Sequence, residues 1–317
     1  MQIAVPTEQW PNERRVALIP DSVKKLARAG FSIHVQDGCG NESGYSNEDY
    51  TEAGATVSSD REAMLRSSDI ILRVRKPNAS EVNLLKAGAV HISYLDPYNE
   101  PDLLDSMAKQ GVSAISMEMI PRTTRAQKMD ALSSQANLAG YVMVMLAAQK
   151  IDRIVPMMMT PAGTLSPAKV FVIGAGVAGL QAIATAKRLG AKVEAFDTRP
   201  VVEEQVKSLG AKFVKIDLGD TGQTDQGYAK ELTEEQVKKQ KEVQSDVCAK
   251  SDIVITTAQI FGKPAPKIID IATIKRMKPG SVIFDMAVET GGNVEGSEVD
   301  KVIDRNGVKI IGISNLA

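Results

Sequence analysis

The most informative stretch of this chain is Val170-Phe-Val-Ile-Gly-Ala-Gly-Val-Ala-Gly179. Its apolar start predicts a buried strand, and the glycines that follow have the G-x-G-x-x-G spacing of a dinucleotide-binding turn. In such a turn Gly174 permits a tight bend, Gly176 lets a pyrophosphate approach the backbone, and Gly179 lets the next helix pack on the strand. A helix over Ala178–Leu189 would then direct its first amide groups toward the phosphates.

The residues around this motif strengthen the prediction, because a glycine pattern alone is weak evidence. Gly190 is expected to end the helix, and a second strand at Val193–Phe196 leads to Asp197, near the position of a ribose-binding acid. A carboxylate accepts hydrogen bonds from a free 2′-hydroxyl and repels a 2′-phosphate, so Asp197 favours NAD over NADP. Arg199 weakens that preference, since it could pair with a phosphate; the alternative is an ordinary surface arginine.

Short β-branched strands alternate with helical segments along the whole chain. Strands are expected at Ile3–Pro6, Ser32–Gln36, Asp69–Arg75, Ala89–Leu95, Ser113–Met119, Lys169–Ile173, Lys192–Phe196, Lys212–Ile216, Asp252–Thr256, Ser281–Asp285 and Val308–Ile313. This order predicts an α/β fold of two Rossmann-like, doubly wound parallel-sheet domains with an interdomain cleft. We place the N-terminal domain at 1–137 and the NAD-binding domain at 138–317, joined by a helix over Ser133–Lys150 that includes a linking segment at 138–150.

Composition excludes several classes of function. The chain has 317 residues, a length typical of two domains, and its net charge of -1 argues against a nucleic-acid binder. Its two cysteines cannot build a disulfide framework or a cysteine-rich metal site. The N-terminus lacks the pattern of a signal peptide, and the apolar stretch Leu138–Ala148 is shorter than the roughly 20 residues of a membrane span. We therefore expect a soluble chain that does not cross a membrane by itself and binds no metal.

Residues that could perform acid–base chemistry are scarce. The two histidines, His34 and His91, fall inside strand patterns, where a structural role is the more common one. The remaining polar cluster is Pro121–Gln135, which is expected to face the cleft; its alternative is a helix cap with solvated charges. Residues 153–167 carry prolines that predict irregular structure. Residues 219–250 predict either a surface loop and a solvated helix or a mobile lid over a ligand.

Across its whole length, the sequence resembles the NAD(H)-binding component of proton-translocating nicotinamide nucleotide transhydrogenases and the related alanine dehydrogenases. The stretches that carry the resemblance are Asn12–Leu18, Ile120–Asp130, Leu132–Tyr141, Gly174–Gly179, Gly227–Glu231 and Thr256–Pro266. The Arg-x-x-x-x-Gln-x-x-Asp loop from Arg122 and the Gly-Tyr-Ala-Lys stretch from Gly227 are specific to the transhydrogenase branch.

This resemblance implies an enzyme that binds NAD(H) and passes hydride directly between NADH and NADP⁺. The NADP(H) would be held on a separate partner component, and proton translocation would belong to a membrane proton-channel component. The resemblance further implies a homodimer that lies peripherally on the cytoplasmic or matrix face of the inner membrane through its partners. It also implies that a helical segment normally follows the last strand and packs back on the first domain, so the C-terminal return segment is expected to be truncated.

Roles for individual residues also follow from the resemblance. It assigns the catalytic loop to Arg122, Gln127, Asp130 and Ser133, which would position the nicotinamide, and assigns the closing loop to Tyr228. The implied cofactor-binding residues are Arg122, Thr123, Thr124, Arg125, Gly174, Gly176, Val177, Gly179, Asp197, Thr198, Arg199, Gly227, Gln240 and Gln259. Gln259 and Phe261 differ from the aliphatic residue and the proline expected at their positions.

Two departures from the alanine dehydrogenase pattern separate the branches. In those enzymes a lysine and a histidine act on the amino acid, and this chain has Arg75 and Asp96 at the corresponding positions. An arginine stays protonated and cannot replace a lysine in amine chemistry. The rival hypotheses are a stand-alone amino-acid dehydrogenase resembling alanine dehydrogenase and an NAD-binding module without enzymatic activity.

Overall fold

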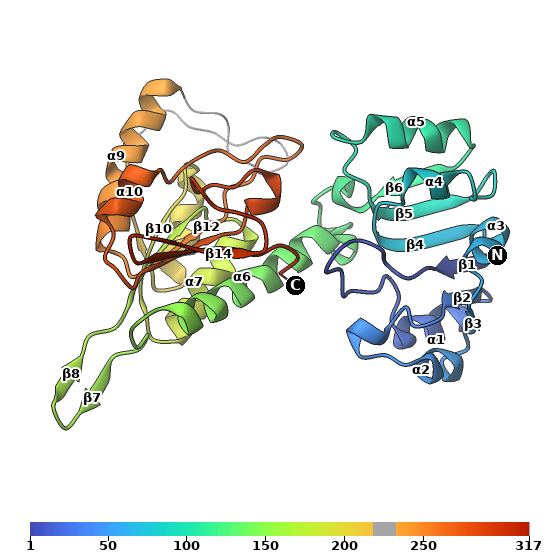
Figure 1. Ribbon diagram of the computed structural model, residues 1–317, viewed down its shortest axis with the longest axis horizontal. Coiled ribbons are helices and arrows are strands. Elements are labelled where there is room, and N and C mark those ends of the chain that lie inside the picture. Colours follow the sequence, from blue (N-terminus) through green and yellow to red (C-terminus); the bar gives the residue numbers. More distant parts are fainter. Residues whose placement is uncertain (218–232, 317) are drawn as a thin grey trace. The chain divides into compact units, whose positions relative to one another are not determined.

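The computed structural model describes residues 1–217 and 233–316 (Figure 1). The chain divides into two compact units, Met1–Ala131 and Leu132–Ala317. Each unit contains one parallel sheet with helices on both faces, so the predicted α/β fold of two Rossmann-like domains is confirmed. The domain boundary expected between residues 137 and 138 stays a prediction.

The first unit is built on a six-stranded parallel sheet in the order β3-β2-β1-β4-β5-β6. This is the doubly wound order in which the chain starts at the centre and winds outward in both directions. Its strands are β1 (Gln2–Val5), β2 (Ser32–Gln36), β3 (Thr56–Ser58), β4 (Ile70–Arg75), β5 (Val90–Tyr94) and β6 (Ser113–Ser116). Its α-helices are α1 (Pro20–Arg28), α2 (Asn47–Glu52), α3 (Arg61–Ser67), α4 (Ala79–Val82) and α5 (Pro101–Lys109).

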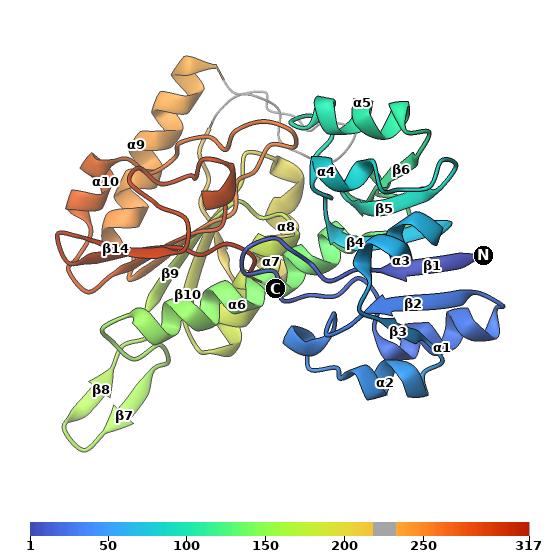
Figure 2. The same ribbon diagram turned by 45° about the vertical axis from the view of Figure 1, so that its right-hand side comes forward.

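Alternating side chains of the central strand bury both faces of this sheet. Ile3 and Val5 of β1 pack with α1 and α2, where Tyr50 is fully buried and its hydroxyl donates to the carbonyl of Leu18. Ala4 points to the other face and packs with residues of α3, α4 and α5. Figure 2 shows these helices on the two sides of the sheet.

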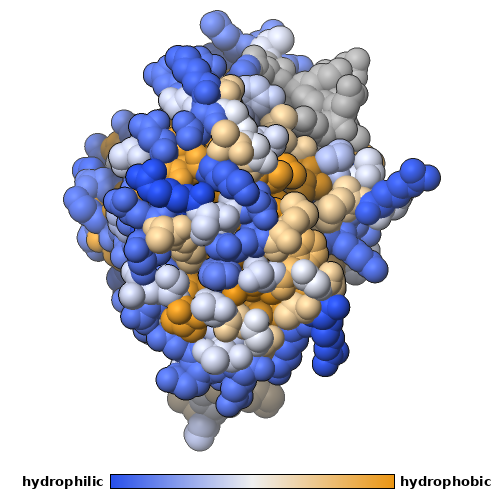
Figure 3. Space-filling model, turned by 90° about the vertical axis from the view of Figure 1, so that its right-hand side faces the viewer, coloured by the Kyte–Doolittle hydropathy of each residue, from blue (hydrophilic) through white to orange (hydrophobic). Residues whose placement is uncertain are grey.

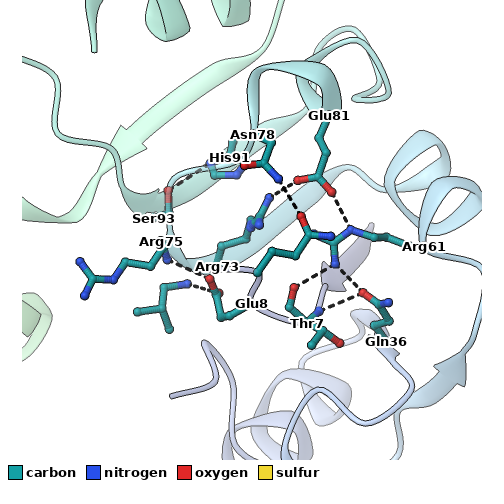
Figure 4. Close-up of polar contacts among 12 residues, drawn as sticks. Thr7, Glu8, Gln36, Arg61, Arg73, Arg75, Asn78, Glu81, His91 and Ser93 are labelled. Carbon is teal, nitrogen blue, oxygen red and sulfur yellow. Dashed lines mark hydrogen bonds and ion pairs between the residues drawn. The ribbon is translucent and has the colours of Figure 1, made fainter. Parts of the chain in front are cut away.

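A buried polar network lies at the first unit's β4 and β5 strands (Figure 4). The carboxylate of Glu81 accepts hydrogen bonds from Arg61 Nε and Arg73 Nη1, both at 2.6 Å. His91 of β5 is fully buried beside Arg73, and burial together with that charge lowers its pKa to about 3. His91 is therefore neutral at physiological pH and part of the core.

The second unit has a seven-stranded sheet in the order β11-β10-β9-β12-β13-β15-β14. Its strands are β9 (Lys169–Ile173), β10 (Lys192–Phe196), β11 (Lys212–Phe213), β12 (Ile253–Thr256), β13 (Val282–Asp285), β14 (Lys301–Arg305) and β15 (Val308–Gly312), and only β14 pairs antiparallel. Its α-helices are α6 (Ala131–Lys150), α7 (Val177–Arg188), α8 (Glu203–Ser208), α9 (Glu234–Lys250) and α10 (Ile271–Arg276). Helices α6, α7 and α8 cover one face, and α9 and α10 cover the other (Figure 2).

The strands expected from the sequence are present, with shifts of one or two residues at most ends. β6 and β11 are shorter than expected, because β6 runs into a 3₁₀ turn at Met117–Met119 and β11 pairs through two residues only. The irregular structure expected over residues 153–167 is wrong in part: β7 (Met158–Thr160) and β8 (Gly163–Leu165) form an exposed antiparallel hairpin. Its strands are exposed on both faces, so no apolar alternation marked them.

Helix α6 is apolar along much of its length. In the part of the chain that the structure describes, it alone is long and apolar enough to cross a membrane by length and composition, and core helices of folded domains pass the same test. Met143, Val144 and Ala147 of α6 are buried in the core of the second unit. Gly140 touches the next helix so closely that a Cβ there would lie 2.3 Å from the carbonyl oxygen of Ala178. These contacts are those of a core helix.

The surface of the molecule mixes apolar and charged side chains. On the face drawn in Figure 3, apolar residues lie in several groups between charged ones. Exposed large apolar residues of the first unit include Trp10, Tyr98, Ile115 and Met119. The truncated C-terminal segment that would cover apolar surface of the first domain stays a prediction.

Candidate functional site

The glycine-rich turn joins β9 to α7 in the second unit. Gly174 has φ +95°, a left-handed conformation that side chains rarely adopt, and a Cβ there would lie 2.6 Å from Thr257 Oγ1. A Cβ on Gly179 would lie 1.8 Å from the carbonyl oxygen of Gly174, so the helix meets the turn at backbone contact. Both positions therefore require glycine for the fold itself.

Gly176 differs from these two glycines. Its φ of -77° is ordinary, and the nearest atom to a Cβ at this position would be Arg199 Nη2 at 4.0 Å, so the space in front of it is open. Gly176 is also the N-cap of α7, and no side chain caps the helix there. Uncapped amide groups at a helix N-terminus, together with the helix dipole, form a site for an anionic group such as a phosphate.

Asp197 and Arg199 lie beside this turn at the end of β10. Asp197 Oδ2 accepts a hydrogen bond from the amide of Ala175 at 2.7 Å, which ties the carboxylate to the glycine-rich turn. The Arg199 guanidinium donates to both carboxylate oxygens, from Nε at 2.9 Å and Nη2 at 2.8 Å. The hydrogen bond to Asp197 raises the pKa of Arg199 despite its burial. Arg199 is thus half-buried and paired, and the alternative of a surface arginine is wrong.

Two further residues at this edge were missed in the sequence. Thr257, just after β12, donates from its hydroxyl to the carbonyl of Gly174 at 3.0 Å. Asn293, after β13, is fully buried and holds the backbone of Ala258 through its side-chain amide. The glycine pair Gly291-Gly292 marked this turn in the sequence, but nothing in the pattern indicated which side chain would organise it.

The polar loop expected to be catalytic lies in the first unit. Arg122, Thr123, Thr124, Arg125 and Gln127 are exposed, and Asp130 is half-buried. Successive turns hold the loop around buried Ala126, whose amide donates to Thr123 and whose carbonyl accepts from Met129. Ser133 is half-buried and belongs to α6, in the second unit.

A second charged cluster of the first unit surrounds Glu13. Its side chain has no exposed surface and bridges two arginines, with Arg15 Nη2 at 2.7 Å and Arg75 Nε at 2.8 Å. Burial by itself raises the pKa of Glu13, but the hydrogen bonds and charges of the two arginines outweigh it and lower the pKa to about 2. Burial raises the pKa of the neighbouring Tyr94 to about 12. None of these groups changes its proton readily near neutral pH.

The other expected cofactor residues lie in several elements. Val177 is exposed at the start of α7, Thr198 is half-buried after β10, Gln240 is half-buried on α9, and Gln259 is exposed after β12. Gly227 and Tyr228 fall outside the described residues. Within residues 1–217 and 233–316, no three His, Cys, Asp or Glu side chains gather where a metal ion could bind.

Comparison with known families matches both halves of the chain. Residues 4–139 match the family described as Alanine dehydrogenase/PNT, N-terminal domain, and residues 143–317 match Alanine dehydrogenase/PNT, C-terminal domain. The matches follow the two parallel sheets and leave only short segments outside.

Individual relatives include enzymes of both kinds. The first of the polypeptides that make up NAD(P) transhydrogenase subunit alpha in Rhodospirillum rubrum is 47% identical over 323 residues, covering 100% of this chain and 84% of that protein. A crystal structure of transhydrogenase from Sinorhizobium meliloti has a TM-score of 0.88 at 46% identity and covers 100% of this chain and 87% of that one. An L-alanine dehydrogenase structure has a TM-score of 0.80 at 25% identity, covering 99% of this chain and 82% of that one.

Proposed function

The chain belongs to the alanine dehydrogenase/PNT family, and we propose that it is the NAD(H)-binding component of an NAD(P) transhydrogenase. The observation that carries this choice is Arg75, bound to buried Glu13 at 2.8 Å at the position where the alanine dehydrogenase pattern has a lysine. A paired arginine cannot exchange a proton with an amino acid, whereas a nucleotide turn of the required shape is present.

The proposed reaction transfers hydride between NADH bound here and NADP⁺ bound on a partner component. NADH supplies the hydride, and no proton has to move to a substrate atom, so the chemical step needs no general base. The task of this chain is then to orient the nicotinamide ring to a near-attack distance of about 3–3.5 Å from its acceptor and to exclude water.

The residues fit that task in two groups. The open space at Gly176 and the uncapped start of α7 suit a pyrophosphate, and Asp197 suits the ribose hydroxyls. In this proposal, Arg122, Gln127, Asp130, Ser133 and Tyr228 position the nicotinamide and its partner. The remaining nucleotide contacts would come from Thr123, Thr124, Arg125, Gly174, Val177, Gly179, Thr198, Arg199, Gly227, Gln240 and Gln259.

The partners follow from the same proposal. They are an NADP(H)-binding component and a membrane component that couples hydride transfer to proton translocation. The chain would act as a homodimer on the cytoplasmic or matrix face of the inner membrane. The relatives named as transhydrogenase subunits support this arrangement.

One assay tests the reaction against both rivals. The purified chain is mixed with NADH, an NADP(H)-binding component of a related transhydrogenase and an NADP⁺ analogue whose reduction shifts its absorbance. We expect reduction of the analogue only when both proteins are present. Oxidation of NADH by pyruvate and ammonium without the partner would support the amino-acid dehydrogenase instead. Tight NADH binding without turnover in either mixture would leave the non-enzymatic binding module.

A further inference from the structure

The loops that follow β12 and β13 are joined by the side chain of one buried residue. Asn293 has no exposed surface, and its side-chain amide makes three hydrogen bonds. Oδ1 accepts from the amide of Ala258 at 3.2 Å, while Nδ2 donates to the carbonyls of Ala258 at 2.8 Å and Pro266 at 2.9 Å. Asn293 therefore grips the loop after β12 at both of its ends, using both amide donors and the oxygen.

Asn293 is itself held in place by the end of the neighbouring strand. Asp285, the last residue of β13, is fully buried, and its Oδ1 accepts from the amide of Asn293 at 3.1 Å. Its Oδ2 accepts from the amide of Val294, also at 3.1 Å. A Cβ on Gly292, which has φ +81°, would lie 2.7 Å from Asp285 Oδ2, so the turn can close on the carboxylate only with glycine there.

The loop gripped by Asn293 contacts the glycine-rich turn directly. Thr257 precedes Ala258, and its hydroxyl donates to the carbonyl of Gly174 at 3.0 Å. The amide of Thr257 donates to the carbonyl of Ile173, the last residue of β9, at 2.9 Å. Since a Cβ on Gly174 would lie 2.6 Å from Thr257 Oγ1, the two segments are in close contact, and a shift of one displaces the other.

From this chain of contacts, we propose that Asn293 is a positioning residue for the NAD(H) site, acting on the glycine-rich turn through Ala258 and Thr257. The inference rests on the proposed function, because it assumes that the turn binds the pyrophosphate of NAD(H). Asn293 touches no part of the turn itself. Its effect comes from pre-organising the backbone, so that binding does not have to order the loop.

A variant and a matched control separate this role from general stability. Asn293→Ala removes all three side-chain hydrogen bonds at the carboxyl end of β12. Asp252→Ala removes a buried carboxylate at the amino end of the same strand, where it accepts from the amide of Lys169 at 2.7 Å and from Arg153. Both losses leave buried groups without partners, so both variants should unfold at lower temperature than the wild type.

The two variants should differ in nucleotide binding. With NADH titrated well below the unfolding temperature of each variant, we expect Asn293→Ala to weaken binding about tenfold, the equivalent of about one or two lost hydrogen bonds. Asp252→Ala should bind NADH as the wild type does. Equal NADH affinity in Asn293→Ala and the wild type would overturn the inference, as would an equal loss in Asp252→Ala.

Thr257→Val keeps the inference testable if Asn293→Ala does not fold. Valine has nearly the shape of threonine and removes only the hydroxyl, so NADH binding should weaken by a smaller factor, about threefold. In the double variant the two losses should be less than additive, because both act through the same turn. Full additivity, or no effect of Thr257→Val, would count against the inference.

The wild type distinguishes a failure of this inference from a failure of the proposed function. Absence of NADH binding by the wild-type chain would contradict the proposed function. Binding by the wild type with unchanged affinity in Asn293→Ala and Thr257→Val would leave that function intact and remove only the positioning role.

Discussion

Arg199 holds the carboxylate of Asp197 with two parallel hydrogen bonds, from Nε at 2.9 Å and from Nη2 at 2.8 Å. The same carboxylate also accepts from the amides of Ala175 at 2.7 Å and Arg199 at 2.9 Å. A carboxylate offers about four acceptor positions, so these donors occupy it fully. A ribose can hydrogen-bond to Asp197 only when one donor moves away, and the Arg199 side chain is the one that can rotate.

The first prediction concerns the choice of cofactor. Asp197→Asn should weaken NADH binding about tenfold, because the amide loses acceptor capacity toward ribose hydroxyls. It should also strengthen NADPH binding, since Arg199 is released to pair with a 2′-phosphate. Titration with both nucleotides measures this change. Glu194→Gln on the same strand, where Glu194 pairs with exposed Lys212, is the control. An unchanged preference for NADH in Asp197→Asn would contradict the role of this acid.

The second prediction separates two glycines of the turn. Gly179→Ala should destabilise the second unit by about 3 kcal/mol or more, because its methyl group would overlap the carbonyl oxygen of Gly174. Gly176→Ala should leave the unfolding temperature nearly unchanged, since its backbone is ordinary and the space in front is open. Its methyl group should instead obstruct the pyrophosphate and weaken NADH binding. Thermal unfolding and NADH titration of both variants would contradict this division if Gly176→Ala bound normally.

The third prediction concerns the pH dependence of the first unit. Glu13 is buried, and pairing with Arg15 and Arg75 lowers its pKa to about 2, below its ordinary value. A lowered folded-state pKa means that the stabilisation is complete above about pH 4.5 and disappears as the pH falls toward 2. Glu13→Gln should therefore cost about 3 kcal/mol at pH 7 and progressively less below about pH 4.5.

Denaturant unfolding of the wild type and Glu13→Gln at several pH values measures this difference. Glu42→Gln is the control, because Glu42 pairs with Arg14 at the surface, at 3.7 Å and with both side chains mostly exposed. That variant should change stability by less than about 1 kcal/mol. A cost of Glu13→Gln that stays constant from neutral to strongly acidic pH would show that the charge of Glu13 is not what stabilises the cluster.

The fourth prediction concerns the exposed loop of the first unit. Arg122→Ala should reduce partner-dependent reduction of the NADP⁺ analogue about 100-fold, because a small misplacement of the nicotinamide has a large effect on hydride transfer. The exposed neighbour Lys128 has no role in the proposal, so Lys128→Ala should react at nearly the wild-type rate. Rates at saturating NADH separate this effect from weaker binding. Equal rates for the two variants would remove Arg122 from the catalytic loop.

Local patterns were sufficient to predict most of the fold. The β9 strand and the glycines after it have the expected positions, because a buried parallel strand needs continuous apolar residues and a tight turn needs glycine. The hairpin of β7 and β8 was missed, since its residues are exposed and carry no apolar alternation. The 3₁₀ end of β6 was also missed, because Met117–Met119 continues the apolar pattern after the strand has ended.

Individual contacts within the site were harder to predict. Asp197 was identified from its distance to the glycine motif, a local feature, whereas its pairing with Arg199 depended on side-chain geometry. Asn293 was not identified at all, because an asparagine after two glycines is also typical of an ordinary turn. Only its burial and its bonds to Ala258 and Pro266 distinguish it.

The amino-acid sequence alone determined the two α/β halves, the glycine-rich turn and the replacement of an acid–base pair by Arg75 and Asp96. These features depend on residue type and short spacing, which a linear pattern contains. The tertiary structure decided how Glu13 binds Arg75, 62 residues away, and how Asn293 binds Ala258, 35 residues away. Such contacts form only when parallel strands bring their ends to one edge of a sheet, and burial then makes each unpaired polar atom costly enough to select its partner.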